Sequence, residues 1–566
     1  MTPYITYFVT SIILGLCLCI IFSVDKKAAA AAGDVKIDAV NFPDPYVRAA
    51  VKEKDADKNG VLSQEEISKI KEITFESWDE KINKSYPLNL AGISYLTNLN
   101  KVNISAIIEN GKEELLKLPK LKSFRYSCVV SGALSTDLSW LEGIEELEIQ
   151  LGKVEEIILP KDNYLKKLKI YLKSTENFKK LDLSQFTNLT SLFLWVDNPS
   201  NIMVSSAPNL TYYQLRLHGK KPLLIENIAQ IKELKIEENA DVPDVTVRNC
   251  PALQKFSIDN GNKLKKVNLS TLPNLKELNI KTEKLKELNV SSLTNLTKIK
   301  LITPKLKKLV VSQKSKLHTL WIFASDLTNL DMSRMRKIES LDIRSKKIKK
   351  INMSYAKQLQ YLHMYNLKNL KHLDLSKQKK LIQLDLASMK KLKKIVFPKK
   401  KISWERIELV NCKALDIPME KLSKVKELCV RGNKKISTLD LRKFKRLYEL
   451  EWTEGVLKKV KWGKPKKLTF LNVNSNKLSG KWDLRKNLSG VSKIECYDNR
   501  LTTIIGGKHN VLLYCDKNRL KKVDMRATKN LAVLSCVKNK GVRVYMPTEL
   551  EDGPNVDRSA KVIYKK

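Results

Sequence analysis

The chain is poor in the residues from which active sites and linkers are usually built. Its 566 residues include 5 histidines, and none of them lies beside a cysteine or serine in a nucleophile arrangement. No glycine-rich phosphate loop is present, and no C-x-x-C pair indicates a zinc site. No stretch rich in proline, glycine or serine marks a linker. We therefore predict a non-enzymatic protein whose main part is one continuous array.

Long apolar runs are also scarce, and the clearest one lies near the N-terminus. Residues 4–24 are uncharged and mostly apolar, and three charged residues and a run of alanines follow them. This order is typical of a secretory signal with a cleavage site near Ala29–Ala32. The run is also about as long as a membrane span, so an uncleaved anchor is the alternative. Residues 1–32 are thus predicted to be a signal peptide or anchor, and the protein to be secreted or displayed on the cell surface.

A short repeat fills most of the remaining chain. Between Leu264 and Phe397 the pattern L-x-x-L-x-L recurs in units that alternate between eleven and ten residues, so two units form a repeat of 21 residues. This period is typical of a leucine-rich repeat solenoid, in which one coil buries its apolar face only against a neighbouring coil. Recurring serines lie 21 positions apart: Ser270, Ser291, Ser312, Ser333 and Ser354. We expect these serines, and asparagines later in the chain, to bond to backbone groups where the coil turns.

The spacing L-x-L predicts one strand per coil. Residues two apart in a strand point to the same side, so both leucines face the core and the residue between them faces out. The first of these core residues recurs at intervals of 19 to 24, which gives about 21 coils: Val102, Phe124, Leu147, Leu168, Leu192, Tyr213, Leu234, Phe256, Leu278, Ile299, Leu320, Leu341, Leu362, Leu384, Ile407, Leu428, Leu450, Leu471, Ile494, Leu513 and Leu534.

The predicted fold is therefore a solenoid with a parallel β-sheet and little helix over residues 99–541. The other side of each coil is predicted to be a strand or an extended segment. Residues 542–566 are predicted to supply closing strands. Cys496, Cys515 and Cys536 fall at core positions of this register, and Cys250 and Cys412 fall at corners, so all five are predicted to be structural free thiols.

One motif with a specific chemistry precedes the repeats. The stretch DADKNGVLSQEE places oxygen-bearing residues at positions 1, 3, 5, 7, 9 and 12 of a loop, with Gly60 at position 6. Calcium prefers six to eight oxygen ligands, and this spacing supplies carboxylates, an amide, a backbone carbonyl and a bidentate glutamate. The predicted ligands of Ca²⁺ are Asp55, Asp57, Asn59, Val61, Ser63 and Glu66.

The flanking segments have helical spacing, which predicts a small EF-hand-like helical cap over residues 33–98. No second loop of this type is present, so we expect a single and weak site whose role is structural. A secreted protein meets millimolar calcium, where a site with a dissociation constant of about 10⁻⁴–10⁻³ M still fills. Leu62, at position 8, is the apolar residue that pairs such a loop with a neighbour.

The order of these parts resembles a known family. The segment NFPDPYVRAAVKEKDADKNGVLSQEEISKIKEI, followed by AGISYLTNL and then by the repeats, resembles secreted or surface leucine-rich repeat proteins of Gram-positive bacteria that begin with an EF-hand-like cap. The late segment LYCDKNRLKKVDMRATKNLAVLSCVKNKG is similar to the repeat of that family. Internalins are similar in plan, although their cap generally lacks a complete calcium loop. The resemblance implies binding of an extracellular protein or glycan and names no ligand.

The outward positions of the strand series are where a partner is expected to bind. Tryptophan, tyrosine and arginine contribute disproportionately to interface energy. The candidate residues are Phe193, Trp195, Arg216, Trp321, Phe323, His363, Tyr365, Tyr497 and Tyr514. Trp321, Phe323, His363 and Tyr365 form the densest group. The alternative is that these aromatic side chains cover a neighbouring coil.

Charge gives a competing interpretation. The formal net charge is +44, and residues 34–84 hold 12 acidic and 9 basic residues, so the repeats carry all of the excess. Most lysines lie along the coil edges, where their field attracts polyanions such as wall teichoic acids, acidic glycans or anionic membranes. A merely solvated lysine-rich surface explains the charge equally well. Nucleic acid is disfavoured because a secreted chain meets little of it.

The sequence thus favours an extracellular interaction module. It is predicted to be a monomer that binds a protein or glycan through its strand face and carries a structural calcium ion in its cap. The alternative function is a wall-associated or polyanion-associated structural protein that binds through its lysine-rich edges. Contact with a membrane is expected only through the N-terminal segment, if it stays uncleaved.

Overall fold

A computed structural model gives the fold of residues 33–79, 84–128, 135–217, 219–237, 242–400, 402–463, 465–547 and 553–564. The chain divides into two compact units. Unit 1 comprises Met1–Lys221 and Glu226–Ala240, and unit 2 comprises Pro222–Ile225 and Asp241–Lys566. The predicted leader, residues 1–32, lies outside the described residues. In the part of the chain that is described, no helix is both long and apolar enough to cross a membrane.

Helices are few and short among the described residues. Two of them precede the repeats, and both begin at a capping residue. The Asp44 carboxylate accepts hydrogen bonds from two backbone N–H groups of the first turn, and Ser63 and Glu66 form a reciprocal capping box. Val47 and Ile67 bury the apolar faces of these two helices. The helices are α2 (Pro45–Lys52), α3 (Gln64–Lys69), α4 (Lys112–Leu116) and α5 (Leu484–Asn487), with 3-10 turns η1 (Ile93–Tyr95), η2 (Val204–Ser206) and η3 (Met419–Lys421).

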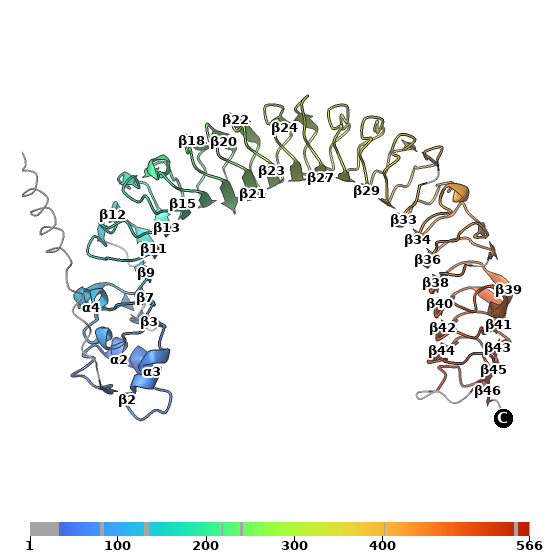
Figure 1. The fold of residues 1–566 in the computed structure, drawn as a ribbon, viewed down its shortest axis with the longest axis horizontal. Helices are drawn as coiled ribbons and strands as arrows, with labels where there is room; N and C mark the ends of the chain where they lie inside the picture. Colours follow the sequence, from blue (N-terminus) through green and yellow to red (C-terminus); the bar gives the residue numbers. More distant parts are fainter. Residues whose placement is uncertain are drawn as a thin grey trace, which may run out of the picture. The chain divides into compact units, whose positions relative to one another are not determined.

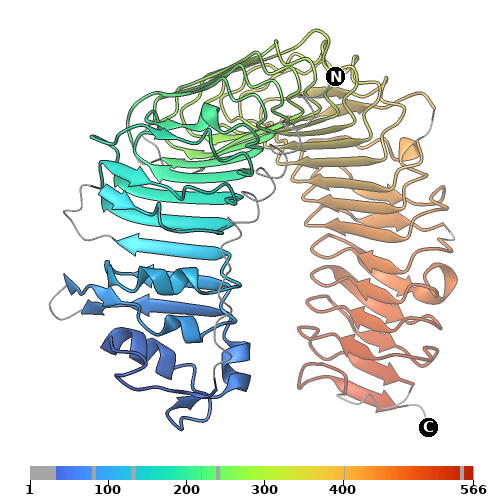
Figure 2. The same ribbon diagram turned by 60° about the vertical axis from the view of Figure 1, so that its left-hand side comes forward.

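Each unit contains a long parallel sheet, called here the main sheet, to which every coil contributes one strand (Figures 1 and 2). In unit 1 the strands are β3 (Glu72–Glu76), β7 (Lys101–Ser105), β9 (Ser123–Cys128), β11 (Glu146–Lys153), β13 (Lys167–Ser174), β15 (Ser191–Val196), β17 (Tyr212–Leu217) and β19 (Glu233–Glu237). In unit 2 they are β21 (Lys255–Gly261), β23 (Glu277–Thr282), β25 (Lys298–Ile302), β27 (Thr319–Phe323), β28 (Ser340–Arg344), β29 (Tyr361–Tyr365), β31 (Gln383–Ala387), β33 (Arg406–Val410), β34 (Glu427–Arg431), β36 (Glu449–Thr453), β38 (Phe470–Asn472), β40 (Lys493–Glu495), β42 (Leu512–Tyr514) and β44 (Val533–Ser535).

Shorter strands line the opposite side of the coils. In unit 1 these are β6 (Leu88–Asn89) with β8 (Ile108–Asn110), β10 (Ser135–Asp137) with β12 (Glu156–Ile158), and β14 (Leu181–Asp182) with β16 (Ile202–Met203). In unit 2 the first groups are β18 (Leu223–Glu226) with β20 (Asp244–Arg248) and β22 (Lys266–Ser270), β24 (Glu287–Val290) with β26 (Lys308–Val311), β30 (His372–Asp374) with β32 (Lys394–Val396), and β35 (Thr438–Asp440) with β37 (Lys459–Lys461). The last group is β39 (Ser479–Asp483), β41 (Arg500–Ile505), β43 (Lys522–Asp524), β45 (Arg543–Met546) and β46 (Lys561–Tyr564).

The predicted register is confirmed. All of the predicted core residues are at most 2% exposed. Within each unit they pair strand to strand in the predicted order, for example Leu320 with Leu341 and Leu341 with Leu362. The main sheet starts one coil earlier than predicted, because Ile73 of β3 pairs with Val102. This strand lies inside the segment predicted as the cap. The predicted closing segments form β45 and β46, which pair in parallel.

At the coil corners, the side chain that forms the hydrogen bond is not the one that was predicted. We expected the side chains of the recurring serines to form hydrogen bonds with backbone groups at the corners. Instead, an Asp or Asn two residues earlier accepts a hydrogen bond from the serine backbone N–H, as Asn289 does for Ser291 and Asp331 does for Ser333. Carboxylate and amide oxygens make such turns more strongly than a hydroxyl does. Ser312 behaves as expected, because its hydroxyl accepts from the N–H of Lys314.

Asparagines act as predicted in the last coils. The Asn499 Nδ2 donates to the carbonyl oxygens of Val473 at 2.9 Å and Cys496 at 3.2 Å, and its Oδ1 accepts from the Leu478 N–H at 3.0 Å. One buried amide therefore joins backbone groups of two successive coils. The same arrangement recurs at Asn476, Asn518 and Asn539. Cys412, Cys496, Cys515 and Cys536 are free thiols, and Cys250, Cys496, Cys515 and Cys536 are fully buried.

Replacement of Asn499 by alanine is expected to destabilise the last coils by about 1–3 kcal/mol, because it leaves buried carbonyl and N–H groups unpaired. Asn289→Ala removes an exposed turn bond and serves as the matched control. Hydrogen exchange measured by mass spectrometry should show faster exchange at residues 473–501 in the first variant only. Equal exchange in both variants would show that the buried amide adds nothing to coil stacking.

Candidate functional site

The calcium loop predicted from the sequence runs between α2 and α3 in unit 1. Gly60 adopts a left-handed conformation, with φ of 82°, that lets the loop turn at position 6. The carboxylates of Asp55, Asp57 and Glu66 converge there, and one oxygen of each lies within 4.8 Å of the others. These three groups come from opposite ends of the loop, so the turn itself brings them together.

The chemistry of this donor set fits a hard divalent cation. Asp55 is 4% exposed, and its Oδ2 accepts a hydrogen bond from the Gly60 N–H at 2.8 Å. Its Oδ1 is buried and has no hydrogen-bond partner among the described residues. A buried carboxylate oxygen without a partner is costly unless a proton or a cation meets it. The residues therefore pass a test of fit for calcium, which binds through such oxygens.

The side chains of the other predicted ligands form hydrogen bonds within the loop. The Asn59 Oδ1 accepts from the Val61 N–H at 2.7 Å, and the Ser63 hydroxyl donates to Glu66 Oε2 at 2.7 Å. Glu66 also accepts from the backbone N–H groups of Ser63 and Ala56. These bonds, those of Ser63 first, lower the pKa of Glu66 to about 2, so this carboxylate is ionised at neutral pH.

The loop has a partner that the sequence did not reveal. Strand β1 (Val35–Lys36) pairs antiparallel with β2 (Val61–Leu62), so that Leu62 meets Val35. The Gln64 backbone N–H donates to the Asp34 carboxylate at 3.1 Å. In this chain the N-terminal segment thus takes the position that a second loop takes in paired sites. A strand of two residues has no pattern from which it could have been predicted.

In unit 1, three of the predicted strand-face residues come together on β15 and β17. Tyr171 of β13, which was not predicted, is the centre of this cluster. Its ring centroid lies 5.1 Å from that of Phe193 and 5.8 Å from that of Trp195. The guanidinium of Arg216 lies 5.2 Å from the Trp195 ring centroid. Trp195 remains 39% exposed, so the cluster is accessible.

In unit 2, the densest predicted group lies on β27 and β29 and is divided by β28. Asp342 of β28 pairs in register with Trp321 on one side and His363 on the other. The Trp321 indole N–H donates to Asp342 Oδ2 at 2.9 Å. In the neighbouring row, Arg344 of β28 lies 4.7 Å from the ring centroid of Tyr365. The aromatic side chains are therefore separated by charged residues instead of forming one apolar patch.

Burial of acidic side chains distinguishes this group from the surrounding surface. His363 Nε2 lies 3.5 Å from Asp385 Oδ2. Asp385 is 7% exposed. Burial is the main cause that raises the pKa of both Asp342 and Asp385. One oxygen of each has no hydrogen-bond partner in the described part of the chain. We call Trp321, Asp342, Arg344, His363, Tyr365 and Asp385 the strand-face cluster.

Of the remaining predicted residues in unit 2, Phe323 borders this cluster, and Tyr497 and Tyr514 lie apart from it. Phe323 is half-buried at the end of β27, beside Arg344 in the register. Tyr514 is on β42, with Lys493 stacked 5.9 Å from its ring centroid, and Tyr497 follows the end of β40. Six strands separate β29 from β42 in the main sheet, which places Tyr514 on the order of 30 Å from Tyr365.

Acidic side chains, called here the acidic stretch, occupy the part of the main sheet between β29 and β42. They were not predicted from the sequence as a group. Its outward residues are Glu408, Glu427, Glu449, Glu451 and Glu495, on strands β33, β34, β36 and β40. Arg406 and Lys493 neutralise part of this charge. The pKa of Glu449 is nevertheless raised, by burial first and then by the charges of Glu427 and Glu451. The register alone would have shown these residues, because they recur at the outward positions of four of the five coils from β33 to β40.

Comparisons with known proteins show similarity of fold. The functional domain of InlJ from Listeria monocytogenes is 16% identical, covers 81% of this chain and 84% of its own, with a TM-score of 0.35. Internalin InlF from the same organism is 15% identical (66% and 100% coverage, TM-score 0.32), and a leucine-rich repeat protein of Leptospira interrogans is 19% identical (69% and 89%, TM-score 0.36). Neither a family model nor a curated protein sequence matches the chain. Function is therefore argued from the chain's own residues.

The Trp321–Asp342 hydrogen bond is expected to contribute about 1–3 kcal/mol at pH 7 in a double-mutant cycle of Trp321→Phe and Asp342→Ala, since asparagine could still accept the bond. The bond favours the charged carboxylate, so its loss raises the pKa of Asp342 in the folded state further. The coupling should be complete at neutral pH and weaken as the pH falls through that raised pKa, because a protonated carboxyl is the weaker acceptor. Thermal unfolding of the four proteins of the cycle, at pH 7 and at roughly pH 3, measures the coupling energy at each pH. A coupling that is zero, or unchanged at low pH, would contradict the assignment.

Proposed function

We propose that this protein is a secreted or surface-displayed binding scaffold that holds a protein partner on the main sheet of unit 2. The observation that carries this proposal is the strand-face cluster. Its aromatic side chains project from a rigid sheet, and each is held by a neighbour on the adjacent coil. Side chains fixed in this way lose little conformational entropy when a partner binds. Tryptophan, tyrosine and arginine are also the residues that most often carry interface energy.

The charge of the face favours a partner with basic residues. The acidic stretch lies beside the strand-face cluster along the same sheet, although the whole chain has a net charge of +44. Complementary charges select partners and speed their association. An acidic glycan or teichoic acid would meet carboxylates there, and it would be directed to the lysine-rich edges. Those edges support the alternative function, polyanion binding at the wall, which uses a different surface.

Photo-crosslinking is expected to show whether a partner binds the strand face or the lysine-rich edges. A crosslinking amino acid at Tyr365, on the strand face, should form discrete products with an extracellular protein and should still form them in about 0.5 M salt. The same amino acid at Tyr355, which is 39% exposed in the segment between β28 and β29, is the matched control. Products formed equally at both positions, or at Tyr355 alone, would favour polyanion binding at the edges.

We also propose that the loop from Asp55 to Glu66 holds a structural calcium ion. The convergence of Asp55, Asp57 and Glu66 and the unpartnered Asp55 Oδ1 support this. Asn59, the Val61 carbonyl and Ser63 would complete the ligand set. The ion would offset most of the negative charge of the three carboxylates and fix the loop against β1, where the N-terminal segment joins the first coil.

Calcium is expected to stabilise the protein by about 1.4 kcal/mol at about 10 mM, if the dissociation constant is about 10⁻³ M. Asp55→Asn keeps a side chain that can accept from Gly60 and removes the charge, so it should abolish the effect. Glu65→Ala is the matched control, because Glu65 is an exposed neighbour that pairs with Lys69. Calorimetric titration and thermal unfolding test both variants. Absence of binding, or equal binding by Asp55→Asn, would overturn the proposal.

A further inference from the structure

The positive charge of the chain is concentrated in one part of unit 2. Residues 261–400 include 34 basic and 9 acidic residues, which is a net charge of +25 out of the +44 of the whole chain. An equally long stretch, residues 101–240, lies mostly in unit 1 and includes 19 basic and 18 acidic residues. Both stretches are built from the same kind of coil. A lysine-rich composition shared by the whole chain therefore does not explain the difference.

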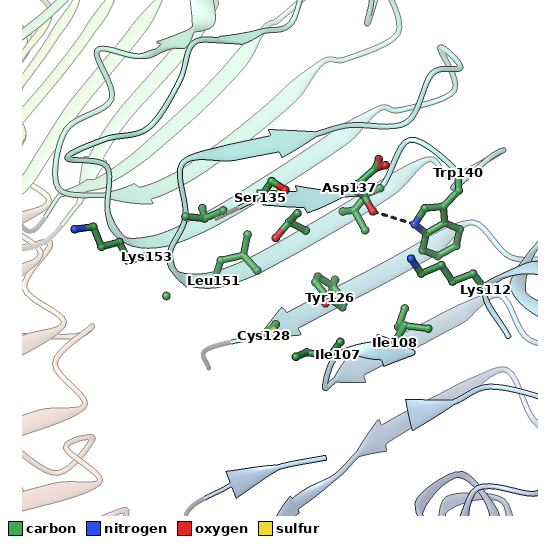
Figure 3. Close-up of a pocket in the computed structure, with 14 residues that line it drawn as sticks. Ile107, Ile108, Lys112, Tyr126, Cys128, Ser135, Asp137, Trp140, Leu151 and Lys153 are labelled. Carbon is green, nitrogen blue, oxygen red and sulfur yellow. Dashed lines mark hydrogen bonds between the residues drawn. The ribbon is translucent and has the colours of Figure 1, made fainter. Parts of the chain in front are cut away.

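In unit 1, several lysines have neighbours that offset their charge or cover it. Lys179 and Lys153 each pair with a glutamate of a neighbouring coil, at 3.2 and 3.9 Å. Lys112 lies beside Trp140, with its ammonium 5.8 Å from the ring centroid (Figure 3). Acidic and basic side chains thus face each other between coils, and little charge remains to attract a polyanion.

In unit 2, a row of lysines follows the side of the coils opposite the main sheet, called here the back. Each member of the row directly follows a buried leucine or isoleucine, and each member is exposed. Five of them directly precede the back strands β22, β24, β26, β30 and β32. The position is a lysine in six of seven successive coils, and Thr328 occupies it in the seventh. The members of this lysine row are Lys265, Lys286, Lys307, Lys349, Lys371 and Lys393.

Backbone hydrogen bonds hold neighbouring members of the row one coil apart. The Lys307 N–H donates to the carbonyl oxygen of Lys286 at 2.7 Å, and the Lys393 N–H donates to that of Lys371 at 2.9 Å. Successive coils lie about 4.8 Å apart, which is less than the Debye length of about 8 Å at physiological salt. In four of the six coils the next residue is also a lysine. The charges of the row therefore act together on a ligand.

The charge of the row is not neutralised by the described residues. None of the six ammonium groups forms an ion pair with a described carboxylate. The acidic residues on the same back strands are Glu287 and Asp374. The pKa of Asp326 is lowered, by its hydrogen bond with Lys347 first, and the charges of Lys305 and Lys307 add to this effect. A positive field is thus present at this surface.

The residue types of the row favour one kind of polyanion. Lysine is a point charge on a flexible stem and lacks the planar fork with which arginine binds a phosphate bidentately. The outward residues of β22, β24, β26, β30 and β32 include no phenylalanine, tyrosine or tryptophan. The bases of a single-stranded nucleic acid would therefore find no ring on which to stack. The row fits a flexible, linear chain of phosphates that carries no bases.

We propose that the lysine row binds a linear polymer of alditol phosphates. The polymer follows the row from coil to coil, and its phosphodiesters meet the ammonium groups. This inference rests on the alternative function given above, polyanion binding, and assigns to it a surface and a ligand. It does not rest on the strand-face partner, because the row lies on the opposite side of the coils. Crosslinking at Tyr365 therefore tests that partner independently.

Deacylated poly(glycerol phosphate) carrying a fluorescent label is the probe, and fluorescence anisotropy of the full chain is the measurement. The expected dissociation constant is about 10⁻⁶–10⁻⁴ M at physiological salt. Replacement of Lys286, Lys307, Lys349 and Lys371 by glutamine should weaken binding at least about tenfold. The same variant should lower the slope of affinity against salt, on logarithmic axes, by about 3, because each phosphate contact contributes roughly 0.7.

The matched control replaces Lys161, Lys180, Lys508 and Lys529 by glutamine. These exposed lysines lie outside residues 261–400, and their loss changes the net charge by the same amount. The control should change affinity by less than about twofold, because the field of the row stays intact. Both variants should melt at the temperature of the parent chain or above it, since the substitutions remove repulsion between like charges.

An oligothymidylate with the same number of phosphates tests the class of polymer. It should bind no more tightly than poly(glycerol phosphate), because the row offers its bases no aromatic ring. Absence of poly(glycerol phosphate) binding at about 1 mM phosphate, or equal weakening in the two lysine variants, would overturn the proposal. Binding of oligothymidylate that is tighter by more than about threefold would assign the row to nucleic acid and would also overturn it.

Discussion

Every coil of this chain depends on in-register pairing with the next coil, because one L-x-L strand cannot bury its leucines alone. Parallel strands lie about 4.8 Å apart, so residues about 21 positions apart in sequence become neighbours on the sheet. Trp321, Asp342, His363 and Asp385 form one row for this reason. Any site on the face is therefore assembled from successive coils. Its chemistry depends on which side chains share a row.

The same constraint explains what the sequence could predict of the fold. The apolar period determines which residues face the core, and the core residues and their pairing were predicted correctly. Strand β3 was missed although Ile70, Ile73 and Phe75 have the L-x-x-L-x-L spacing, because Ile70 directly follows α3 and the whole segment was assigned to the helical cap. Strand β1 was missed because a pairing of two residues has no period. At the corners, the bonding Asp and Asn residues were visible, yet their role was assigned to the serines that follow them.

For the sites, the sequence predicted which residues lie together but not the contacts between their side chains. The fixed spacing of the calcium loop placed Asp55, Asp57 and Glu66 together, as the structure does. It gave no sign that Asn59 and Ser63 bond inside the loop. On the strand face, the aromatic residues were found from their outward positions. The cations stacked on them and the buried acids between them depend on side-chain direction, which a repeat does not encode.

Small residues occupy different core positions in the two units, and strand length accounts for the difference. The strands that precede Cys496, Cys515 and Cys536 have three residues, and the chain turns at an asparagine soon after each cysteine. These coils have no third inward position to fill, and all three cysteines are fully buried. Strands β9 and β11 have six and eight residues, so their coils enclose a third position. In that layer Cys128 of β9 lies beside Leu151 of β11, so a small side chain adjoins a large one there.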